Sequence, residues 1–225
     1  MTRRLTAGLL GAATLAVGPV AGPPSASAAP CPDVEVTFAR ATTEPPGIGS
    51  VGQAFVDAVR SQVRGRSVGV YAVDYPATED FAPSASAGAA NASAHVQSMA
   101  ANCPGTRLVL GGYSQGAIVI NLITAIPVSL GGFAPAPMPR EVADHVAAVA
   151  VLGNPVDRYV GAPLTALSPL YGPKAIDLCA GGDPICSAGA GGATPSREEM
   201  FSPAHLSYEE SGLVVQAATF AAGRL

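Results

Sequence analysis

The chain contains no tryptophan, and aromatic residues of all kinds make up only 5% of its 225 residues. A surface that stacks nucleic-acid bases or sugar rings is therefore not expected. Charged residues are also scarce, at 12%, the formal net charge is −4, and no run of basic residues occurs. Nucleic-acid binding requires a basic surface, so the sequence predicts no nucleic-acid partner.

Apolar residues, glycine and proline are abundant instead. Hydrophobic residues make up 48% of the chain, which is enough for a sizeable core and argues against disorder. The 26 glycines and 21 prolines imply many turns. The length fits one ordinary domain once a targeting segment is removed, and no internal repeat or interdomain linker is evident.

The first 28 residues have the three parts of an export signal. Arg3 and Arg4 supply positive charge, residues 5–20 are apolar, and Ala26-Ser27-Ala28 has the small-x-small pattern that signal peptidase cleaves. We expect a signal peptide over residues 1–28 and a secreted domain over residues 29–225, either free or associated with the cell envelope. A membrane anchor is disfavoured because glycine and proline interrupt the apolar run. Two arginines alone do not decide between general and twin-arginine export.

Four cysteines remain in the expected mature chain, and an even number in an exported protein predicts disulfides. Cys179 and Cys186 flank a Gly-Gly-Asp-Pro turn, so we pair them, which leaves Cys31 to pair with Cys103. The chain-entropy model assigns roughly 4 kcal/mol to the long loop and roughly 2.5 kcal/mol to the short one. A zinc site is the alternative, but the spacing fits no zinc motif and the three histidines are scattered. We expect neither a metal ion nor a cofactor.

Strand patterns alternate with helical patterns along the chain. Strands are predicted over residues 34–39, 67–73, 108–112, 145–152 and 175–178, and helices over 49–63, 86–102, 115–125 and 205–222. The segments 76–83, 131–139 and 181–203 are rich in turn-forming residues and are predicted to be loops. The alternation predicts a three-layer α/β fold, with a mostly parallel five-stranded sheet covered by helices on both faces. Chemistry in such folds takes place at the carboxyl ends of the strands.

A serine lies between two glycines at the end of the third predicted strand, in Gly112-Tyr113-Ser114-Gln115-Gly116. A G-x-S-x-G sequence between a strand and a helix is typical of a nucleophilic serine held in a tight turn. The helix that follows directs free backbone N–H groups toward the point where an oxyanion would form. The alternative is a glycine-rich turn with an incidental serine.

A nucleophilic serine needs a base, and the chain offers three histidines. His95 is expected within a helix and His145 at the start of a buried strand, and both positions favour structural roles. His205 lies after the serine, where a loop meets the last helix. The chain order of serine, acid and then histidine in α/β hydrolases selects His205.

The acid is expected between Ser114 and His205, where four aspartates qualify by order: Asp144, Asp157, Asp177 and Asp183. Asp183 is preferred because it follows a predicted strand and lies inside the Cys179–Cys186 loop. A loop braced in this way would hold the carboxylate that orients the histidine. Asp177 is the second candidate, and a turn-capping role before Pro184 is the alternative for Asp183.

Four segments together resemble the cutinases, small secreted serine esterases of the α/β-hydrolase fold with two disulfides. They are Gly112–Gly116, Cys179–Cys186, Ala204–Tyr208 and Phe38–Glu44. The stretch Glu44–Gly49 is similar to actinobacterial cutinase-like proteins. The resemblance covers nearly the whole expected mature chain, with the segments in the same order.

The resemblance implies a catalytic triad of Ser114, Asp183 and His205 that forms an acyl-enzyme. It also implies an oxyanion hole made by the backbone N–H of Gln115 and by the backbone and hydroxyl of Thr42. The expected enzyme is a monomeric carboxylic ester hydrolase that acts on short- to medium-chain acyl esters, a cutin-like polyester or lipid.

The chain departs from the family pattern at three places. Ala41 replaces the usual glycine, and Thr42 is bulkier than the serine of fungal members. The segment 187–203 is longer than in fungal cutinases, and either forms a flap that orders on substrate or, as we prefer, a plain surface loop.

Other functions stay open at this stage. An acetylxylan or other carbohydrate esterase would use the same fold and triad, a mycolyl or other acyltransferase would pass the acyl group to an alcohol, and a secreted surface protein would have lost activity. Five apolar residues near the site suit a lipid or polyester surface if exposed and an ordinary core if packed: Phe81, Ile185, Met200, Phe201 and Leu206.

Overall fold

Five apolar stretches of the chain form one sheet, in which every pair of neighbouring strands is parallel. The strands lie in the order β2-β1-β3-β4-β5. They are β1 (Val34–Ala39), β2 (Val68–Ala72), β3 (Arg107–Tyr113), β4 (Val146–Leu152) and β5 (Ala175–Leu178). The three central strands, β1, β3 and β4, are buried almost throughout, which explains why β4 and most of β3 are continuously apolar, whereas β1 alternates and buries Glu35 and Thr37.

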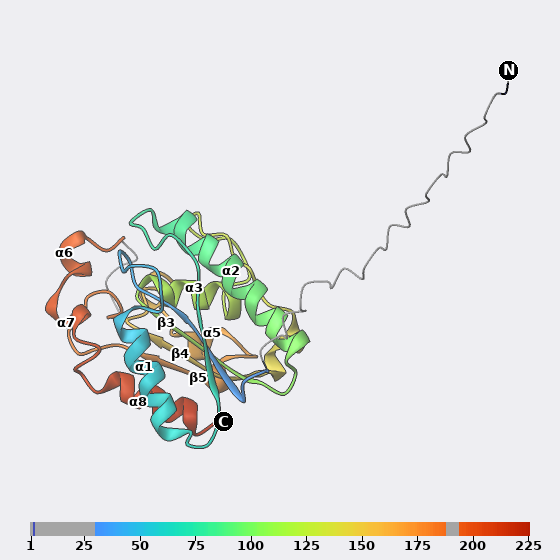
Figure 1. Cartoon of the computed structure of the whole chain (residues 1–225). Helices are drawn as coiled ribbons and strands as arrows, with labels where there is room; N and C mark the ends of the chain where they lie inside the picture. The colour runs from blue at the N-terminus through green and yellow to red at the C-terminus, as the bar shows by residue number, and fades with distance from the viewer. Residues whose placement is uncertain (1, 3–29, 188–193) are drawn as a thin grey trace. The chain divides into compact units, whose positions relative to one another are not determined.

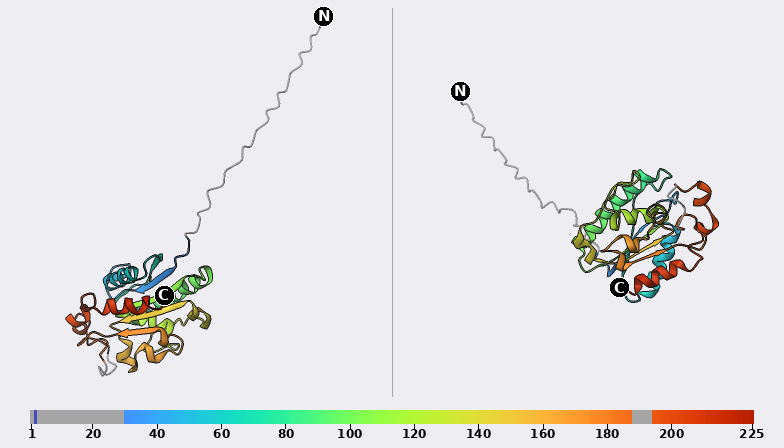
Figure 2. Two further views of the ribbon diagram at one scale, coloured as in Figure 1. Left: turned by 90° about the horizontal axis from the view of Figure 1, so that it is seen from below. Right: turned by 180° about the vertical axis from the view of Figure 1, so that it is seen from behind.

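Two helices cover each face of the sheet. On one face α1 (Gly49–Gln62) and α8 (Leu213–Ala222) pack on the strands, and on the other α2 (Phe81–Asn102) and α3 (Gln115–Thr124) do so. Figure 1 shows α1 and α8 below the sheet and α2 and α3 above it, and the view from behind keeps this separation (Figure 2). The two helix layers enclose two separate clusters of buried apolar side chains. The predicted three-layer α/β-hydrolase fold is confirmed.

The computed structural model describes residue 2, residues 30–187 and residues 194–225. The expected signal peptide and the middle of the segment 187–203 lie outside these residues. The fold described here belongs to the unit Cys31–Leu225. Across the described residues, no helix combines the length and the apolarity needed to cross a bilayer.

Both predicted disulfides are confirmed, Cys31 with Cys103 and Cys179 with Cys186. The first ties the segment before β1 to the end of α2. The second closes a short loop directly after β5, at the carboxyl edge of the sheet.

Several predicted boundaries were wrong. Helix α2 begins at Phe81 instead of residue 86, because Pro83 falls in the first helical turn, where its missing N–H leaves no bond unmade. The last helix begins at Leu213 instead of His205, since Gly212 adopts a left-handed conformation (φ 78°) that separates it from a short helix, α7 (Pro203–Leu206).

Five further short elements lie within segments that the sequence left as loops or unassigned. They are α4 (Val156–Val160), α5 (Leu164–Leu167), α6 (Arg197–Met200) and the 3-10 helices η1 (Arg140–Asp144) and η2 (Gly172–Lys174). Elements of three to five residues show too little periodicity to be recognised from a pattern.

Candidate active site

Ser114 sits in a strained turn between β3 and α3. Its backbone has φ 56° and ψ −118°, a conformation that non-glycine residues rarely adopt. A Cβ atom at Gly112 would lie 2.3 Å from the carbonyl oxygen of Gly116, and one at Gly116 would lie 1.9 Å from that of Ala39. Both positions therefore require glycine, and the sharp turn presents the serine at the carboxyl edge of the sheet.

A continuous chain of hydrogen bonds links Ser114, His205 and Asp183. The Nε2 atom of His205 lies 2.9 Å from Ser114 Oγ, and its Nδ1 atom lies 2.9 Å from Asp183 Oδ2. Asp183 is fully buried, His205 is 2% exposed and Ser114 is 9% exposed. The structure thus brings together the three side chains selected from the sequence, although 91 residues separate Ser114 from His205.

The two other histidines lie elsewhere. His95, on α2, bonds through Nε2 to Glu35 at 2.7 Å and stacks on Tyr71. His145 is half-buried and lies between η1 and β4.

The carboxylate of Asp183 is held by three donors. Besides His205, the backbone N–H of Ile185 donates to Oδ1 at 2.8 Å and the hydroxyl of Tyr208 donates to Oδ2 at 2.7 Å. Burial alone would raise the pKa of Asp183, but these bonds, led by the one from His205, hold it below its ordinary value of 3.8. Asp183 therefore stays ionised at neutral pH, as a group that orients an imidazole must.

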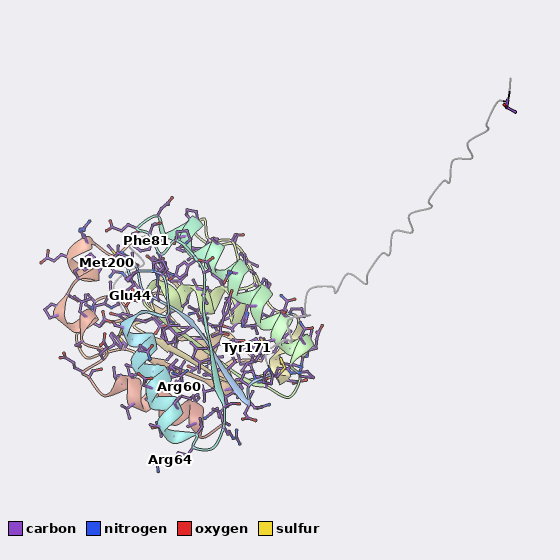
Figure 3. The ribbon with its side chains drawn as sticks, in the orientation of Figure 1. Glu44, Arg60, Arg64, Phe81, Tyr171 and Met200 are labelled. Carbon is purple, nitrogen blue, oxygen red and sulfur yellow. A yellow bond between two sulfur atoms is a disulfide. The ribbon has the colours of Figure 1, made fainter. Side chains whose placement is uncertain are left out.

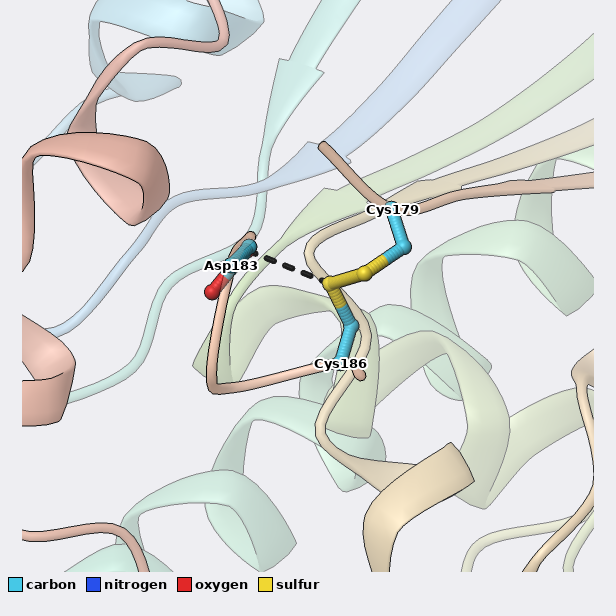
Figure 4. Close-up of side chains that lie close together, drawn as sticks. All are labelled: Cys179, Asp183 and Cys186. Carbon is cyan, nitrogen blue, oxygen red and sulfur yellow. Dashed lines mark hydrogen bonds between the residues drawn. A yellow bond between two sulfur atoms is a disulfide. The ribbon is translucent and has the colours of Figure 1, made fainter. Parts of the chain in front are cut away.

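The Cys179–Cys186 disulfide packs directly against Asp183 (Figure 4), with Cys186 Sγ 3.2 Å from Oδ2. A disulfide sulfur carries no proton, so this is a packing contact that fixes the loop. The ligand atoms of Cys179, Asp183 and Cys186 lie within 4.8 Å of one another. Metal ions bind thiolates, however, and here both sulfurs are joined to each other, so the group does not fit a metal site.

Two tyrosines support the site and were missed in the sequence. Tyr208 is fully buried, and its hydroxyl accepts a hydrogen bond from Ala180 N–H while donating to Asp183. The Tyr113 hydroxyl donates to the backbone carbonyl of His205. Tyr208 follows His205 by three residues, a spacing that could have suggested a contact, whereas nothing in the local pattern indicates the role of Tyr113.

The other candidate acids lie away from Ser114. Asp177 on β5 and Asp157 on α4 both accept hydrogen bonds from the side-chain amide of Asn154, at 2.8 and 3.1 Å. Asp144 ends η1 and precedes β4, at the opposite edge of the sheet from the carboxyl ends of the strands.

The turn after β1 lies beside Ser114 because β1 and β3 are neighbours. Thr42, in this turn, lines a cavity of about 190 Å³ that Ser114 and His205 also line. The side chain of Gln115 is held away from the cavity: it donates to Thr78 O at 2.8 Å and accepts from Ser84 Oγ at 3.1 Å. Its backbone N–H is at the first position of α3, where N–H groups have no partner within the helix.

The turn that carries Thr42 is braced on both sides. The guanidinium of buried Arg40 donates to the carbonyls of Glu44 at 2.8 Å and Tyr75 at 2.7 Å. The Glu44 carboxylate accepts from Ala41 N–H at 2.6 Å on one oxygen and from Ser50 N–H at 2.8 Å on the other. Thr43 adopts φ 63°, so the turn is strained and depends on these contacts.

The five apolar residues expected near the site fall into two groups. Phe201 and Leu206 are exposed, at 43% and 57%. Ile185 is buried, and Phe81 and Met200 are half-buried. Figure 3 shows Phe81, Met200 and Glu44 at the same end of the domain, far from Arg64 in the turn after α1.

Comparison with known proteins decides the family. The model of the family described as "Cutinase" matches residues 30–225. The chain belongs to the cutinase family. Carboxylesterase Culp1 of Mycobacterium tuberculosis is 50% identical to this cutinase-family chain over 224 residues, which cover 97% of this chain and 94% of that protein. Phospholipase Culp4 of the same organism is 49% identical over 226 residues, 99% of this chain and 92% of that protein.

Similar solved structures also support the cutinase family. A Trichoderma reesei cutinase in complex with a phosphonate inhibitor is 31% identical, with a TM-score of 0.65 over 86% of this chain and 77% of that one. The catalytic core of a T. reesei acetyl xylan esterase is 25% identical, with a TM-score of 0.71 over 87% and 100%. This member of the cutinase family is a carboxylic ester hydrolase.

In this cutinase-family enzyme, Glu44→Gln is expected to lower kcat on p-nitrophenyl butyrate roughly tenfold to a hundredfold, with little change in KM. Glutamine offers one acceptor oxygen where the carboxylate offers two, so the N–H of Ala41 or of Ser50 would face an amide NH2 group. The Thr42 turn would shift, and transition-state stabilisation would fall more than substrate binding.

Glu79→Gln is the matched control, because Glu79 lines the same cavity and, among the residues that the structure describes, pairs only with exposed Arg197. A surface ion pair of this kind contributes little. Equal kcat values for the two variants would show that Glu44 does not position the turn.

The Asp157–Asp177 pair of this cutinase-family protein should make stability depend on pH. Burial, together with the charge of Asp177, raises the pKa of Asp157 from 3.8 to about 7. A carboxyl group whose pKa is higher when folded stabilises the fold fully below its unfolded pKa, and loses that contribution as pH rises through the folded value. We expect the Tm to fall between about pH 4 and pH 7, and to fall less in Asp157→Asn, which stays neutral.

Asp57→Asn, on the exposed face of α1, serves as the control for this measurement. Thermal melts across the pH range of both variants and the parent would give the comparison. Identical pH slopes for Asp157→Asn and the parent would contradict the assignment.

Proposed function

We propose that the protein is a secreted serine esterase that hydrolyses carboxylic esters through Ser114, His205 and Asp183. The observation that carries the proposal is the unbroken path of hydrogen bonds from the buried Asp183 carboxylate through His205 to Ser114 Oγ. A serine hydroxyl is a weak nucleophile by itself, and a base oriented by a carboxylate activates it.

The geometry supports a two-step mechanism. Ser114 Oγ attacks the ester carbonyl carbon as His205 Nε2 takes its proton, and Asp183 stabilises the imidazolium that forms. The backbone N–H groups of Gln115 and Thr42, with the Thr42 hydroxyl, donate to the oxyanion. His205 then protonates the leaving alcohol, and water that it activates releases the acid from the acyl-enzyme.

The proposal includes export and a monomeric state. Two disulfides support an oxidising compartment, since cytosolic proteins rarely keep such bonds. The signal peptide over residues 1–28 and the mature domain over 29–225 are retained as part of this proposal. No nucleic-acid partner is proposed, given the net charge of −4.

A carbohydrate esterase is the second candidate, because the acetyl xylan esterase core shares the fold over its whole length. Rates on p-nitrophenyl butyrate, on longer acyl esters and on acetylated xylan separate the two. Faster hydrolysis of acyl esters than of acetylated xylan is expected, and the reverse order would favour the second candidate. Adding an alcohol acceptor and analysing products tests for acyl transfer in place of hydrolysis.

The segment 187–203 keeps its two interpretations. Its described part contains α6, and Pro195 and Met200 line a small cavity together with Ser114. We retain the surface-loop interpretation as part of the proposal.

A further inference from the structure

A large apolar cavity lies beside the nucleophile helix and takes no part in the chemistry derived above. We call it the chamber; its volume is about 460 Å³, and it lies between α3, α4, the first residues of α2 and the segment 126–133. Its walls are almost entirely apolar, and they are formed by Phe81, Ala82, Ile118, Leu122, Ile126, Leu130, Gly131, Phe133, Val156, Tyr159, Val160 and Thr194.

The chamber adjoins a smaller cavity at the reacting atoms. A second cavity of about 20 Å³ is lined by Ser114 and Gln115, and it shares Phe81, Ile118 and Tyr159 with the chamber. We call this second cavity the neck. A volume of this size is close to the space that one water molecule requires, so the neck is narrow. For an unbranched alkyl chain to pass, the shared side chains must shift, and a sugar ring would require larger shifts.

The position of His205 decides which half of an ester occupies the chamber. His205 lines the 190 Å³ cavity on the Thr42 side of Ser114, and it lines neither the neck nor the chamber. The group that His205 protonates is the leaving alcohol, so the alcohol lies on the Thr42 side. The acyl chain must then extend from the carbonyl carbon in the other direction, through the neck.

The chemistry of the walls fits a hydrocarbon. The hydroxyls of Tyr159 and Thr194 are the polar side-chain groups among the described lining residues, and no charged side chain lines the chamber. Burial raises the pKa of Tyr159, as expected in a poorly hydrated site. A sugar bound here would leave its hydroxyls without partners, which is costly, whereas methylene groups gain from leaving water.

We propose that the chamber binds the acyl chain of the ester substrate, so that the enzyme is selective for long-chain over acetyl and butyryl esters. This inference rests on the proposed function, because it places the acyl carbonyl at Ser114. Each methylene that leaves water is worth roughly a fourfold gain in binding. The value of kcat/KM should therefore rise with chain length until the chamber is full, and the neck should exclude branched or cyclic acyl groups.

Two substitutions at the chamber test the proposal. Ile126→Trp and Val160→Trp place an indole in the chamber from two different segments, at half-buried positions that do not line the neck. Measured with p-nitrophenyl esters from acetate to palmitate, below their aggregation concentrations, both variants should keep the parental rate on butyrate. Both should lose most of the gain on laurate and palmitate. Val215→Trp, on the exposed surface of α8, is the matched control and should keep the parental profile.

A parental profile that does not rise beyond butyrate would overturn the proposal. Ile126→Trp and Val160→Trp variants that keep the parental preference for long acyl chains would overturn it too. Thermal melts identify any variant that does not fold. A binding assay then replaces the kinetic measurement. In Ser114→Ala, a fluorescent C16 fatty acid should bind and unlabelled palmitate should displace it, whereas adding Ile126→Trp should remove binding.

The binding assay also separates the two proposals. Fatty-acid binding without ester hydrolysis in the parent would refute the proposed esterase and keep the chamber as an alkyl-chain site. Butyrate hydrolysis without fatty-acid binding would refute the chamber and leave the esterase intact.

Discussion

Replacing Ser114 by alanine is expected to lower kcat on p-nitrophenyl butyrate about a millionfold, the scale seen when a serine hydrolase loses its nucleophile. The alanine variant retains the His205–Asp183 pair and the oxyanion donors but cannot form an acyl-enzyme. The fold should tolerate the change, because Ser114 Oγ bonds only to His205 Nε2 among the described residues. The Tm should therefore stay near the parental value, and rates at high enzyme concentration give the measurement.

Ser207→Ala is the control for this prediction. Ser207 lies two residues after His205, and its hydroxyl donates to Ala204 O at 2.9 Å, so the variant removes a serine near the site without touching the reacting atoms. It should keep the parental kcat. A Ser114→Ala protein as active as Ser207→Ala would refute the proposed mechanism.

Replacing Asp183 by asparagine is expected to lower kcat about ten thousandfold, because the histidine is then held in the wrong tautomer. In the parent, Oδ2 accepts from both His205 Nδ1 and the Tyr208 hydroxyl, and Oδ1 accepts from Ile185 N–H. Asparagine has one acceptor oxygen for these two positions. Whichever way the amide turns, its NH2 group faces a donor, so His205 either rotates or presents Nδ1 as the acceptor and loses Nε2 as the base.

Asp177→Asn is the matched control, since Asp177 was the second candidate from the sequence. Its carboxylate bonds to Asn154 and to Leu164 N–H and has no hydrogen bond to His205. This variant should keep the parental kcat, with any loss confined to the Tm. Tyr208→Phe removes one of the donors to Asp183 and should cost much less than Asp183→Asn. A large loss of kcat in Asp177→Asn together with an active Asp183→Asn would reverse the assignment of the acid.

Much of the fold follows from short-range patterns in the sequence. The strands β1, β3 and β4 are buried on both faces, so their largely apolar runs were recognisable, and the alternation with helices then implied a parallel sheet. Gly112 and Gly116 marked the turn at Ser114 through the G-x-S-x-G spacing. The contact that requires glycine at Gly112 is local, with Gly116 O, whereas the one at Gly116 is with Ala39 O on β1.

Features that depend on distant parts of the chain were not predictable in this way. Gly212 separates α7 from α8, although the sequence on both sides of it has a composition typical of helices. Tyr113 supports His205 from a residue 92 positions away, and Arg40 braces the Thr42 turn through carbonyls of the segment 73–76. The chamber combines four separate segments, so no single stretch of sequence indicates it.

The central claim is that His205 and Asp183 make Ser114 a nucleophile, and covalent labelling tests it most directly. Incubation of the purified protein with a fluorophosphonate, followed by digestion and peptide mass spectrometry, should show one adduct per chain, on Ser114. Labelling should be lost in Ser114→Ala and strongly slowed in Asp183→Asn. A parent protein that takes up no label, or that carries it on another serine while Ser114 stays unmodified, would contradict the account.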